Sequence, residues 1–481
     1  MINKSISDSK YYSVTNPEYG DHVDQWELVE DAVAGSWKVK KEKTKYLPLP
    51  NPLENRSDYD NPRYDQYIMR AVFFNVCYKT LMGLVGIVFR KAPVVTVPDS
   101  IDYVIDNADG SGISLKQQSQ YVLSEVVKKG RCAMMVDYPT IDGQTSRADV
   151  DRGIRATIKT YAAEFVIDWE EEETQTGTRL NYVKIREIES VLDVVSGERE
   201  LVISYIVLRL IDGVYSIERY DEYGATRNDR TEPRLANGQT LNYIPLVFCG
   251  SENNAPNVDQ ALLYDLAVLN IAHYNNSADA EESSFIAGQP TLAVTSSLNS
   301  TEWAEGNPNG VLLGSRKGHF LGESGSLSLV QASPNILPRE MMKDKEQQFV
   351  ALGAQIVSEN TANETAFAVG AKLSTNTSAL ALSAGNVSDA YKTCLKWCEN
   401  YMTTAPKGDV VFSLNTDFFP ASVDAATLTA WVAGIQGGVL PKSALYDQMR
   451  DANLTALTDD EIMAEVEESG SSLDLSITPN G

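Results

Sequence analysis

Histidine is scarce in this chain: His22, His273 and His319 are the only three among 481 residues. They lie too far apart for most zinc sites, and we interpret them as solvated or core histidines rather than as catalytic bases. The motifs of phosphate-binding loops, zinc proteases and serine hydrolases (G-x-x-x-x-G-K-S/T, H-E-x-x-H and G-x-S-x-G) do not occur. The sequence therefore predicts no catalytic residue, no metal site and no cofactor.

Cysteine is also rare, and five residues are an odd number for a disulfide scaffold in so long a chain. Cys394 and Cys398 are four residues apart on a predicted helix, so they share one face and could provide two metal ligands. No histidine or further cysteine lies near them in the sequence to complete such a site. We therefore favour the packing of two small sulfur side chains in the core.

No hydrophobic run is long enough to predict a membrane span. The most apolar stretch, residues 71–88, is interrupted by Asn75 and Lys79, which favours a buried helix. Residues 1–12 are polar and lack the apolar segment of a secretory signal. The sequence thus predicts no association with a membrane.

Basic residues are outnumbered, because 41 lysines and arginines face 66 aspartates and glutamates and give a formal net charge of −25. Tight binding to nucleic-acid phosphates needs clustered basic side chains, so this balance argues against it, although DNA could still slide past. The basic run Lys38–Lys45 could contact DNA or an acidic protein, or form a solvated arm. The acidic run Glu170–Glu173 could bind a cation or supply paired carboxylates, but we favour a solvated surface loop.

Local signals predict helices in the first part of the chain. Residues 64–90 carry apolar side chains at helical spacing. Ser114 is a candidate N-cap for a helix over residues 115–129, which Gly130 ends. Residues 1–60 are polar and are expected to be loop-like.

Strand signals follow these helices. Residues 131–138 form a short apolar run that predicts a buried strand. Over residues 154–220 the apolar period changes to two, which predicts an antiparallel meander. Residues 243–248 predict a further short strand, and Pro245 favours the edge of a sheet.

The second half has an unusual order, in which a stretch rich in Gly, Ser, Asn and Pro (residues 283–337) separates a helix over 258–282 from one over 338–358. Residues 360–376 are small and polar and predict a flexible loop. Strand-like pieces of the intervening stretch are residues 291–294, 310–313 and 327–330. The remaining predicted elements are a helix, a strand and two helices before an acidic tail: residues 377–401, 410–414, 424–435 and 442–453. This order is expected if two helices form a stalk with a small module at its tip.

Several segments, in this order, resemble the portal proteins of tailed bacteriophages, and among them a portal-like family first catalogued as a domain of unknown function in phage and prophage genomes. The matching segments of the first half are Tyr46-Leu47-Pro48, residues 64–93, Asp109–Ser114, Gly130-Arg131 with Val136-Asp137-Tyr138-Pro139, Ile167-Asp168-Trp169 and Ile244–Val247. Those of the second half are Tyr274-Asn275, Ser277-Ala278-Asp279 and Gly288-Gln289-Pro290. The resemblance spans residues 30–450.

The resemblance implies an α+β portal fold with an α/β wing, a two-helix stem, a small β/α clip and a helical crown. The parts that it implies are an N-terminal arm (1–60), the wing (61–257), a first stem helix (258–282), the clip (283–337), a second stem helix (338–359), a channel loop (360–376), a wing helix and strand (377–422) and a short helical crown with an acidic tail (423–481).

It also implies a ring, usually of twelve subunits, at one capsid vertex, through which double-stranded DNA passes non-specifically during packaging and ejection. The implied partners are further copies of this chain, the terminase packaging motor, a head–tail adaptor, and the major capsid or scaffolding protein. The implied location is the virion, after assembly in the host cytoplasm. The implied site residues are Asn363, Glu364, Phe367, Lys372 and Leu373 in the channel loop; Asp259, Asp265, Lys343 and Lys345 in the stem lumen; and Arg316, Lys317 and His319 at the clip contact with partners.

Two other interpretations stay open at this point. The chain could be another virion ring component such as a head–tail adaptor, although such proteins usually lack the helix–module–helix order. It could also be an acidic hydrolase, which needs two carboxyl groups roughly 5–10 Å apart in a cleft. Nothing in the sequence locates such a pair.

Overall fold

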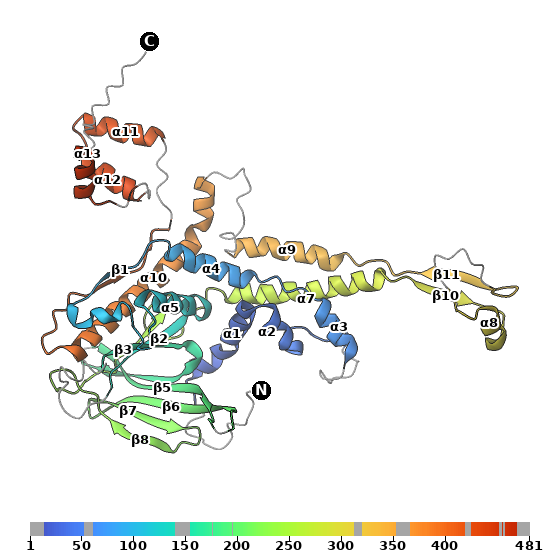
Figure 1. The fold of residues 1–481 in the computed structure, drawn as a ribbon, viewed down its shortest axis with the longest axis horizontal. Helices are drawn as coiled ribbons and strands as arrows, with labels where there is room; N and C mark the ends of the chain where they lie inside the picture. Colours follow the sequence, from blue (N-terminus) through green and yellow to red (C-terminus); the bar gives the residue numbers. More distant parts are fainter. Residues whose placement is uncertain are drawn as a thin grey trace, which may run out of the picture.

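The computed structural model describes residues 14–51, 61–139, 154–175, 177–194, 196–311, 320–352, 366–418, 425–451, 455 and 457–468. The side chains of residues 228, 229, 366–377, 425–428, 448, 450, 451 and 466–468 are outside this description. The chain has a mixed α+β fold. A body of two larger sheets and their covering helices carries a long arm of two long helices, with two strands and a short helix at its tip (Figure 1).

A three-stranded antiparallel sheet forms the centre of the body, in the order β3-β2-β9 (β3 Thr157–Ala162, β2 Arg131–Asp137, β9 Leu246–Gly250). β2 is buried along almost its whole length, which confirms the predicted buried strand. Helix α5 (Leu115–Lys129) precedes it, with a capping box between Ser114 and Gln117. Gly130 ends the helix at φ +70°, where a Cβ atom would meet the carbonyl oxygen of Asp259 at 2.2 Å. Only glycine fits this close approach.

The antiparallel meander predicted over residues 154–220 is confirmed from residue 166 onward as a five-stranded sheet in sequence order (β4 Val166–Thr174, β5 Gly177–Leu192, β6 Arg199–Ile211, β7 Val214–Asp221, β8 Thr226–Thr231). The first strand of the predicted range, β3, belongs to the three-stranded sheet instead. The prediction of a loop at Glu170–Glu173 is wrong, because these residues lie in β4. Their side chains are nevertheless exposed, and the Arg179 guanidinium on β5 pairs with Glu172 at 3.1 Å.

Arg131 joins the two sheets. Its guanidinium lies between the rings of Trp169 on β4 and Phe248 on β9, at 3.8 and 3.9 Å from their centroids. Burial lowers the pKa of this guanidinium to about 9, and none of its nitrogen atoms has a hydrogen-bond partner among the described residues. The two ring faces therefore provide the attraction that holds this cation in the core.

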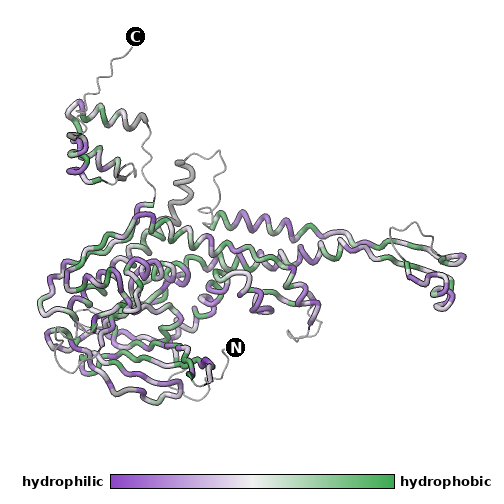
Figure 2. Tube along the Cα trace, in the orientation of Figure 1, coloured by the Kyte–Doolittle hydropathy of each residue, from purple (hydrophilic) through white to green (hydrophobic). Residues whose placement is uncertain are grey.

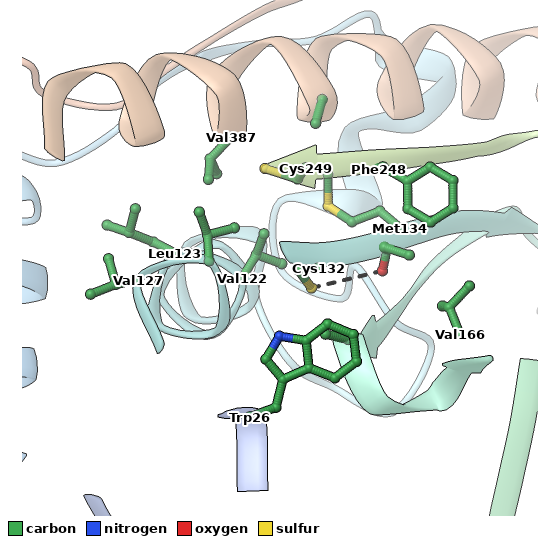
Figure 3. Close-up of a cluster of buried hydrophobic side chains, with 14 of the residues drawn as sticks. Trp26, Val122, Leu123, Val127, Cys132, Met134, Val166, Phe248, Cys249 and Val387 are labelled. Carbon is green, nitrogen blue, oxygen red and sulfur yellow. Dashed lines mark hydrogen bonds between the residues drawn. The ribbon is translucent and has the colours of Figure 1, made fainter. Parts of the chain in front are cut away.

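Helix α10 (Ala366–Met402) crosses the three-stranded sheet and packs against α5 and β9. Figure 3 shows how Val387 of α10, Leu123 of α5, Cys132 of β2 and Cys249 of β9 converge. Directly opposite residues of β2 and β9 include this pair of cysteines. On α10 the spacing of four brings Cys394 and Cys398 to the same buried face, as the sequence predicted.

Within residues 1–60, the described part (residues 14–51) does not form the loop-like arm that was predicted. Helices α1 (Pro17–Ala34) and α2 (Ser36–Lys41) and a short 3-10 turn (Lys43–Lys45) occupy most of the described part. The side chain of Asn16 caps α1, and Pro17 starts it. Trp26 and Val29 are buried, and the Trp26 indole donates to the carbonyl oxygen of Lys129 at 2.9 Å. The few apolar side chains of this polar segment thus face the body.

The helix predicted over residues 64–90 is two helices, α3 (Pro62–Arg70) and α4 (Val76–Val88). Both begin at an asparagine, Asn61 and Asn75, whose side chain accepts a backbone amide of the first turn. Beyond α4 lie β1 (Val94–Thr96) and the 3-10 segment Asp99–Val104. β1 pairs antiparallel with β12 (Val411–Ser413), which brings two distant parts of the chain together.

The arm consists of α7 (Tyr264–Ala287), β10 (Thr291–Thr295), α8 (Ser300–Gly306), β11 (Ser326–Val330) and α9 (Leu337–Ala351). The predicted helix–module–helix order is confirmed, although α7 begins six residues later than predicted. The strand predicted at residues 310–313 is absent from 310–311, and the rest of it lies outside the described residues.

The C-terminal region has three helices, α11 (Ala425–Gln436), α12 (Lys442–Asp451) and α13 (Asp459–Glu468). The first two were predicted, whereas α13 lies in what was expected to be an acidic tail. The predicted loop over residues 360–376 is wrong from residue 366 onward, because α10 begins there. Three of the eight residues between 366 and 373 are alanines, the residue with the highest helix propensity, which favours the longer helix.

All five cysteines are buried, and burial raises the pKa of Cys77 and Cys398 to about 12. Since the thiolate is the reactive form, the raised pKa lowers the fraction of each thiol that can react at pH 8. We predict that thiol reagents at pH 8 leave the native protein almost unlabelled and modify all five cysteines in denaturant. Rapid labelling of Cys394 or Cys398 in the native protein, counted by mass spectrometry, would contradict the buried arrangement.

Candidate functional site: the projecting arm

The base of the arm is fixed by polar side chains of α7. Asn270 is fully buried; its carbonyl oxygen accepts the Val76 amide (3.2 Å) and its amide group donates to the Phe74 carbonyl oxygen (2.9 Å). Seven residues further along α7, the Ser277 hydroxyl accepts the Val72 amide at 3.0 Å. These side chains replace the backbone hydrogen bonds that are lost where α3 ends and α4 begins.

Helix α3 is tied to the middle of the arm by charged and phenolic groups. The Tyr67 hydroxyl donates to the Asp279 carboxylate at 2.6 Å, and the Arg70 guanidinium donates to Glu282. Burial, followed by the neighbouring Asp279 carboxylate, raises the pKa of Tyr67. Arg70 also lies over the ring of Phe285, 4.1 Å from its centroid.

His273 lies where α7, α9 and the segment before α4 meet. Its ring packs against Phe74 (6.3 Å between centroids) and Phe349 of α9 (5.6 Å). Burial lowers the pKa of His273, which outweighs the opposing effect of Glu346, whose carboxylate is 3.8 Å away; nearby Lys345 lowers the pKa further. The neutral imidazole thus acts as an aromatic spacer between the two arm helices.

The tip of the arm is a small module of two strands and one short helix. β10 and β11 pair antiparallel from Thr291 opposite Val330 to Thr295 opposite Ser326. Helix α8 begins with a capping box between Asn299 and Glu302. This pairing within one chain confirms the strands predicted at 291–294 and 327–330.

The arm exposes many apolar side chains. Figure 2 shows hydrophobic positions at intervals along α7 and α9 and in the tip. On α9, only Pro338 and Phe349 are buried, whereas Leu337 is 64% and Met341 48% exposed. The other exposed apolar residues of the arm are Val268, Phe285, Ile286, Phe320, Leu327, Leu329, Val330, Ile336 and Val350. Two helices and two strands are too thin to bury these groups within one chain, and an exposed apolar surface of this kind marks an interaction site.

The four residues expected in a stem lumen differ in their surroundings. Asp265 of α7 and Lys343 of α9 are exposed. Lys345 is half-buried and its ammonium donates to the Asn276 side chain on α7. Asp259 precedes α7 and is buried; its carboxylate accepts the amides of Glu252 and Asn253 at 2.7 and 3.0 Å. The prediction of a solvent-facing Asp259 on a stem helix is therefore wrong.

The other expected site residues fall mostly outside the described part of the chain. Asn363 and Glu364 of the channel loop lie there, as do Arg316, Lys317 and His319 of the clip. Phe367, Lys372 and Leu373 belong to the first turns of α10, whose side chains are not described.

The basic run Lys38–Lys45 is largely neutralised within the chain. The Lys38 ammonium pairs with Asp31 (3.3 Å) and Glu42 (2.5 Å), and Lys45 pairs with Glu27 (2.7 Å). The structure therefore gives these lysines a role in holding α1 and α2 together, and weakens the interpretation of the run as a DNA contact or a free arm.

Among the described residues, no group of three or more histidine, cysteine, aspartate or glutamate side chains is arranged to hold a metal ion. In the same part of the chain, no helix combines the length and the apolar character that crossing a bilayer demands. Asn270 of the arm base was not singled out in the sequence, and Ser277 was named only as part of a segment that resembles the portal family, since asparagine and serine on a long helix do not distinguish a buried partner from solvent.

A family profile described as a domain of unknown function (DUF4055) matches residues 262–402, from just before α7 to the end of α10. No curated protein matches the sequence. Among solved structures, a chain of the virion of a native gene transfer agent particle is similar (9% identity, TM-score 0.39; 89% of this chain and 98% of that chain covered). A chain of the neck of an empty gene transfer agent particle, computed with C6 symmetry, is similar at 12% identity and TM-score 0.42 (80% and 92% covered). Scores below 0.5 do not establish a shared fold.

The anchoring role of Asn270 predicts a stability loss on truncation. Asn270→Ala removes the hydrogen bonds of the Asn270 side chain with the Val76 amide and the Phe74 carbonyl group, which then keep only their bond to each other (2.9 Å), so the free energy of unfolding should fall by about 1–3 kcal/mol. Asn275→Ala on the same helix is the matched control, because the carbonyl oxygen of Asn275 has no hydrogen-bond partner among the described residues. Denaturant unfolding measures both variants, and equal losses would contradict the anchor.

The lowered pKa of His273 predicts a pH-dependent arm. In the unfolded chain His273 binds a proton near the ordinary histidine pKa of about 6.5, whereas in the folded chain it binds a proton only at lower pH. Stability is therefore highest above this pH and falls as the pH is lowered through it. His273→Leu should remove this part of the dependence between pH 8 and 5.5, while His22→Leu on α1 should retain it. Equal pH slopes for wild type and His273→Leu in thermal unfolding would exclude the effect.

Proposed function

We propose that this chain is a portal subunit of a tailed bacteriophage or a related particle. Copies form a ring at one capsid vertex, and the ring is the conduit through which double-stranded DNA is packaged and ejected. The arm tip provides the docking surface for the packaging motor during filling and for a head–tail adaptor afterwards. The chain acts as a structural component rather than as an enzyme.

The observation that carries this proposal is the projecting arm with its exposed apolar side chains. A monomer leaves Leu337 and Met341 in water, whereas a ring places the arm of one subunit against that of the next. Such head-to-tail contacts use different surfaces on the two partners and close when the rotation between subunits divides a full turn. The arm helices then form the stem and the tip module forms the clip.

The tip can also be joined between subunits. β10 and β11 form backbone hydrogen bonds with each other along one edge only, and their outer edges have no partner strand among the described strands. An unpaired edge is a ready template for a further strand. We infer that neighbouring tips pair through these edges, which would bind the clips into a continuous collar.

The charge balance suits a channel that passes DNA without holding it. Basic side chains repeated around a ring would multiply phosphate contacts into strong binding. Twelve copies at −25 each carry roughly −300 before counterions, and a field of this sign repels the duplex. The exposed Asp265 and Lys343 are candidates for the channel wall, and the first turns of α10 with the segment before them are candidates for the constriction.

Electron microscopy of the purified protein tests the proposal: rings with a central hole are expected. Met341→Asp places a charge in the proposed contact between subunits and should cost about 2 kcal/mol at each interface, so the ring population falls while the monomer stays folded. Gln347→Asp, at an exposed position on the same helix, is the matched control and should leave rings intact. A monodisperse wild-type monomer at all concentrations would overturn the proposal.

A further inference from the structure

The hairpin of β5 and β6 extends beyond the rest of its sheet. β4 pairs with β5 only as far as Ile185, and β7 pairs with β6 only from Ser204. Beyond these limits β5 and β6 still pair with each other, up to Leu192 opposite Arg199. We call residues 188–192 together with residues 199–203 the ribbon. Neither of its edges has a partner strand among the described strands.

The edge formed by β5 is the more open of the two. All of its residues, 188–192, are exposed, whereas residues 202 and 203 on the β6 edge are half-buried. The β5 edge is closed just below residue 188, because the Tyr161 hydroxyl donates to the Glu187 carboxylate at 3.3 Å and the Arg186 guanidinium donates to the carbonyl oxygen of Glu164 at 3.1 Å. Five residues are the length of an ordinary strand, so this edge can accept one further strand.

One face of the ribbon is mainly apolar. Successive side chains of a strand point to opposite faces, and directly opposite residues share a face. The register therefore places the following side chains together: Ile188, Ser190, Leu192, Leu201 and Ile203. Leu192 is 44% and Leu201 55% exposed. The charged side chain on this face is that of Arg199 at the tip, which donates to the Ser190 hydroxyl at 3.4 Å.

The other face of the ribbon is acidic. It carries Glu189 and Val191 on β5, and Glu200 on β6 lies opposite Val191. Below them Glu187 is paired with Arg219 at 3.3 Å. Glu189 and Glu200 are exposed and form no ion pair within the described part of the chain. A strand added beside β5 would thus meet apolar side chains on one face and unpaired carboxylates on the other.

A second copy of this chain does not complement the edge. If two β5 edges paired antiparallel, the like faces of both ribbons would lie on the same side of the joined sheet. Glu189 and Glu200 of both copies would then share one face, and like charges on neighbouring strands are destabilising. A strand in which apolar and basic residues alternate fits both faces, because its apolar side chains lie on one side and its cations on the other.

We propose that the β5 edge of the ribbon binds an extended segment of a different protein, in which apolar and basic residues alternate. The segment adds a strand beside residues 188–192, and backbone hydrogen bonds hold it there. Its apolar side chains cover Ile188 and Leu192, and its lysines or arginines pair with Glu189. The inference does not rest on the proposed function, because no residue of the arm takes part in it.

A synthetic peptide tests the site on the full chain. Fluorescence anisotropy of a labelled peptide Val-Lys-Val-Lys-Val-Lys-Val should show saturable binding, and hydrogen exchange of residues 188–192 should slow when it is bound. The matched control peptide has the same composition with its lysines grouped at one end, and it should bind much more weakly. No binding of the alternating peptide would overturn the proposal. Equal affinity of the grouped peptide, or protection of residues 170–174 in place of 188–192, would do so as well.

A charge reversal tests which face receives the cations. Glu189→Lys with Glu200→Lys should weaken binding of the alternating lysine peptide about tenfold. The same variant should gain affinity for the peptide Val-Glu-Val-Glu-Val-Glu-Val. Asp102→Lys with Asp106→Lys, at exposed positions outside the sheet, changes the net charge equally and should leave both affinities unchanged. Equal weakening in the two variants would show attraction to net charge only and would overturn the proposal.

Discussion

The interruption between α3 and α4 is the constraint on which the placement of the arm depends. Helix ends leave backbone amides and carbonyl groups without partners, and here these groups lie against α7, where they are buried or partly buried. Asn270 and Ser277 satisfy them, so α7 cannot rotate about its axis or slide without breaking these bonds. Because α9 reaches the body through α7, with His273 and Phe349 in contact, the same bonds set the direction of the whole arm.

A second group of buried contacts connects this anchor to the sheets. At the C-terminal end of α5, Lys129 pairs with Glu125 (3.0 Å), Glu164 (2.8 Å) and Glu30 of α1 (3.2 Å). A cation in the last turn of a helix also favours the helix dipole. Removal of the Lys129 ammonium would leave these three carboxylates with less compensating charge, which destabilises the folded state. α1 in turn accepts the Val258 amide through Glu18 at 2.9 Å, so α5, α1 and the start of the arm form one connected unit.

The sequence predicted those elements whose signals are local. Ser114 and Gly130 define both ends of α5, and the period of two identified the meander, because each signal depends on neighbours along the chain. The break between α3 and α4 was not predicted, because the side chains that satisfy its backbone groups, Asn270 and Ser277, lie about two hundred residues later in the chain. Helix α1 was not predicted, because only one narrow side of it is apolar. Its polar residues were expected to face solvent, although Asp31 is buried. For the arm, the helix–module–helix order could be predicted, but not which side chains stay exposed, since this depends on the thickness of the structure around them.

The excess of acidic residues has a different meaning in the two parts of the molecule. In the body many carboxylates form ion pairs within the chain: Asp31 and Glu42 pair with Lys38, and Glu218 pairs with Arg209. Burial raises the pKa of Glu30, whereas Lys129 and Lys128 lower it, and the net effect is a lowered pKa. This carboxylate therefore stays ionised beside the two lysines. On the arm, Asp265 is exposed and Glu281 likewise meets solvent. A surface that combines such charges with exposed apolar side chains can associate with copies of itself through the apolar groups while it repels a polyanion. The total of −25 alone does not reveal this distribution of charge between body and arm.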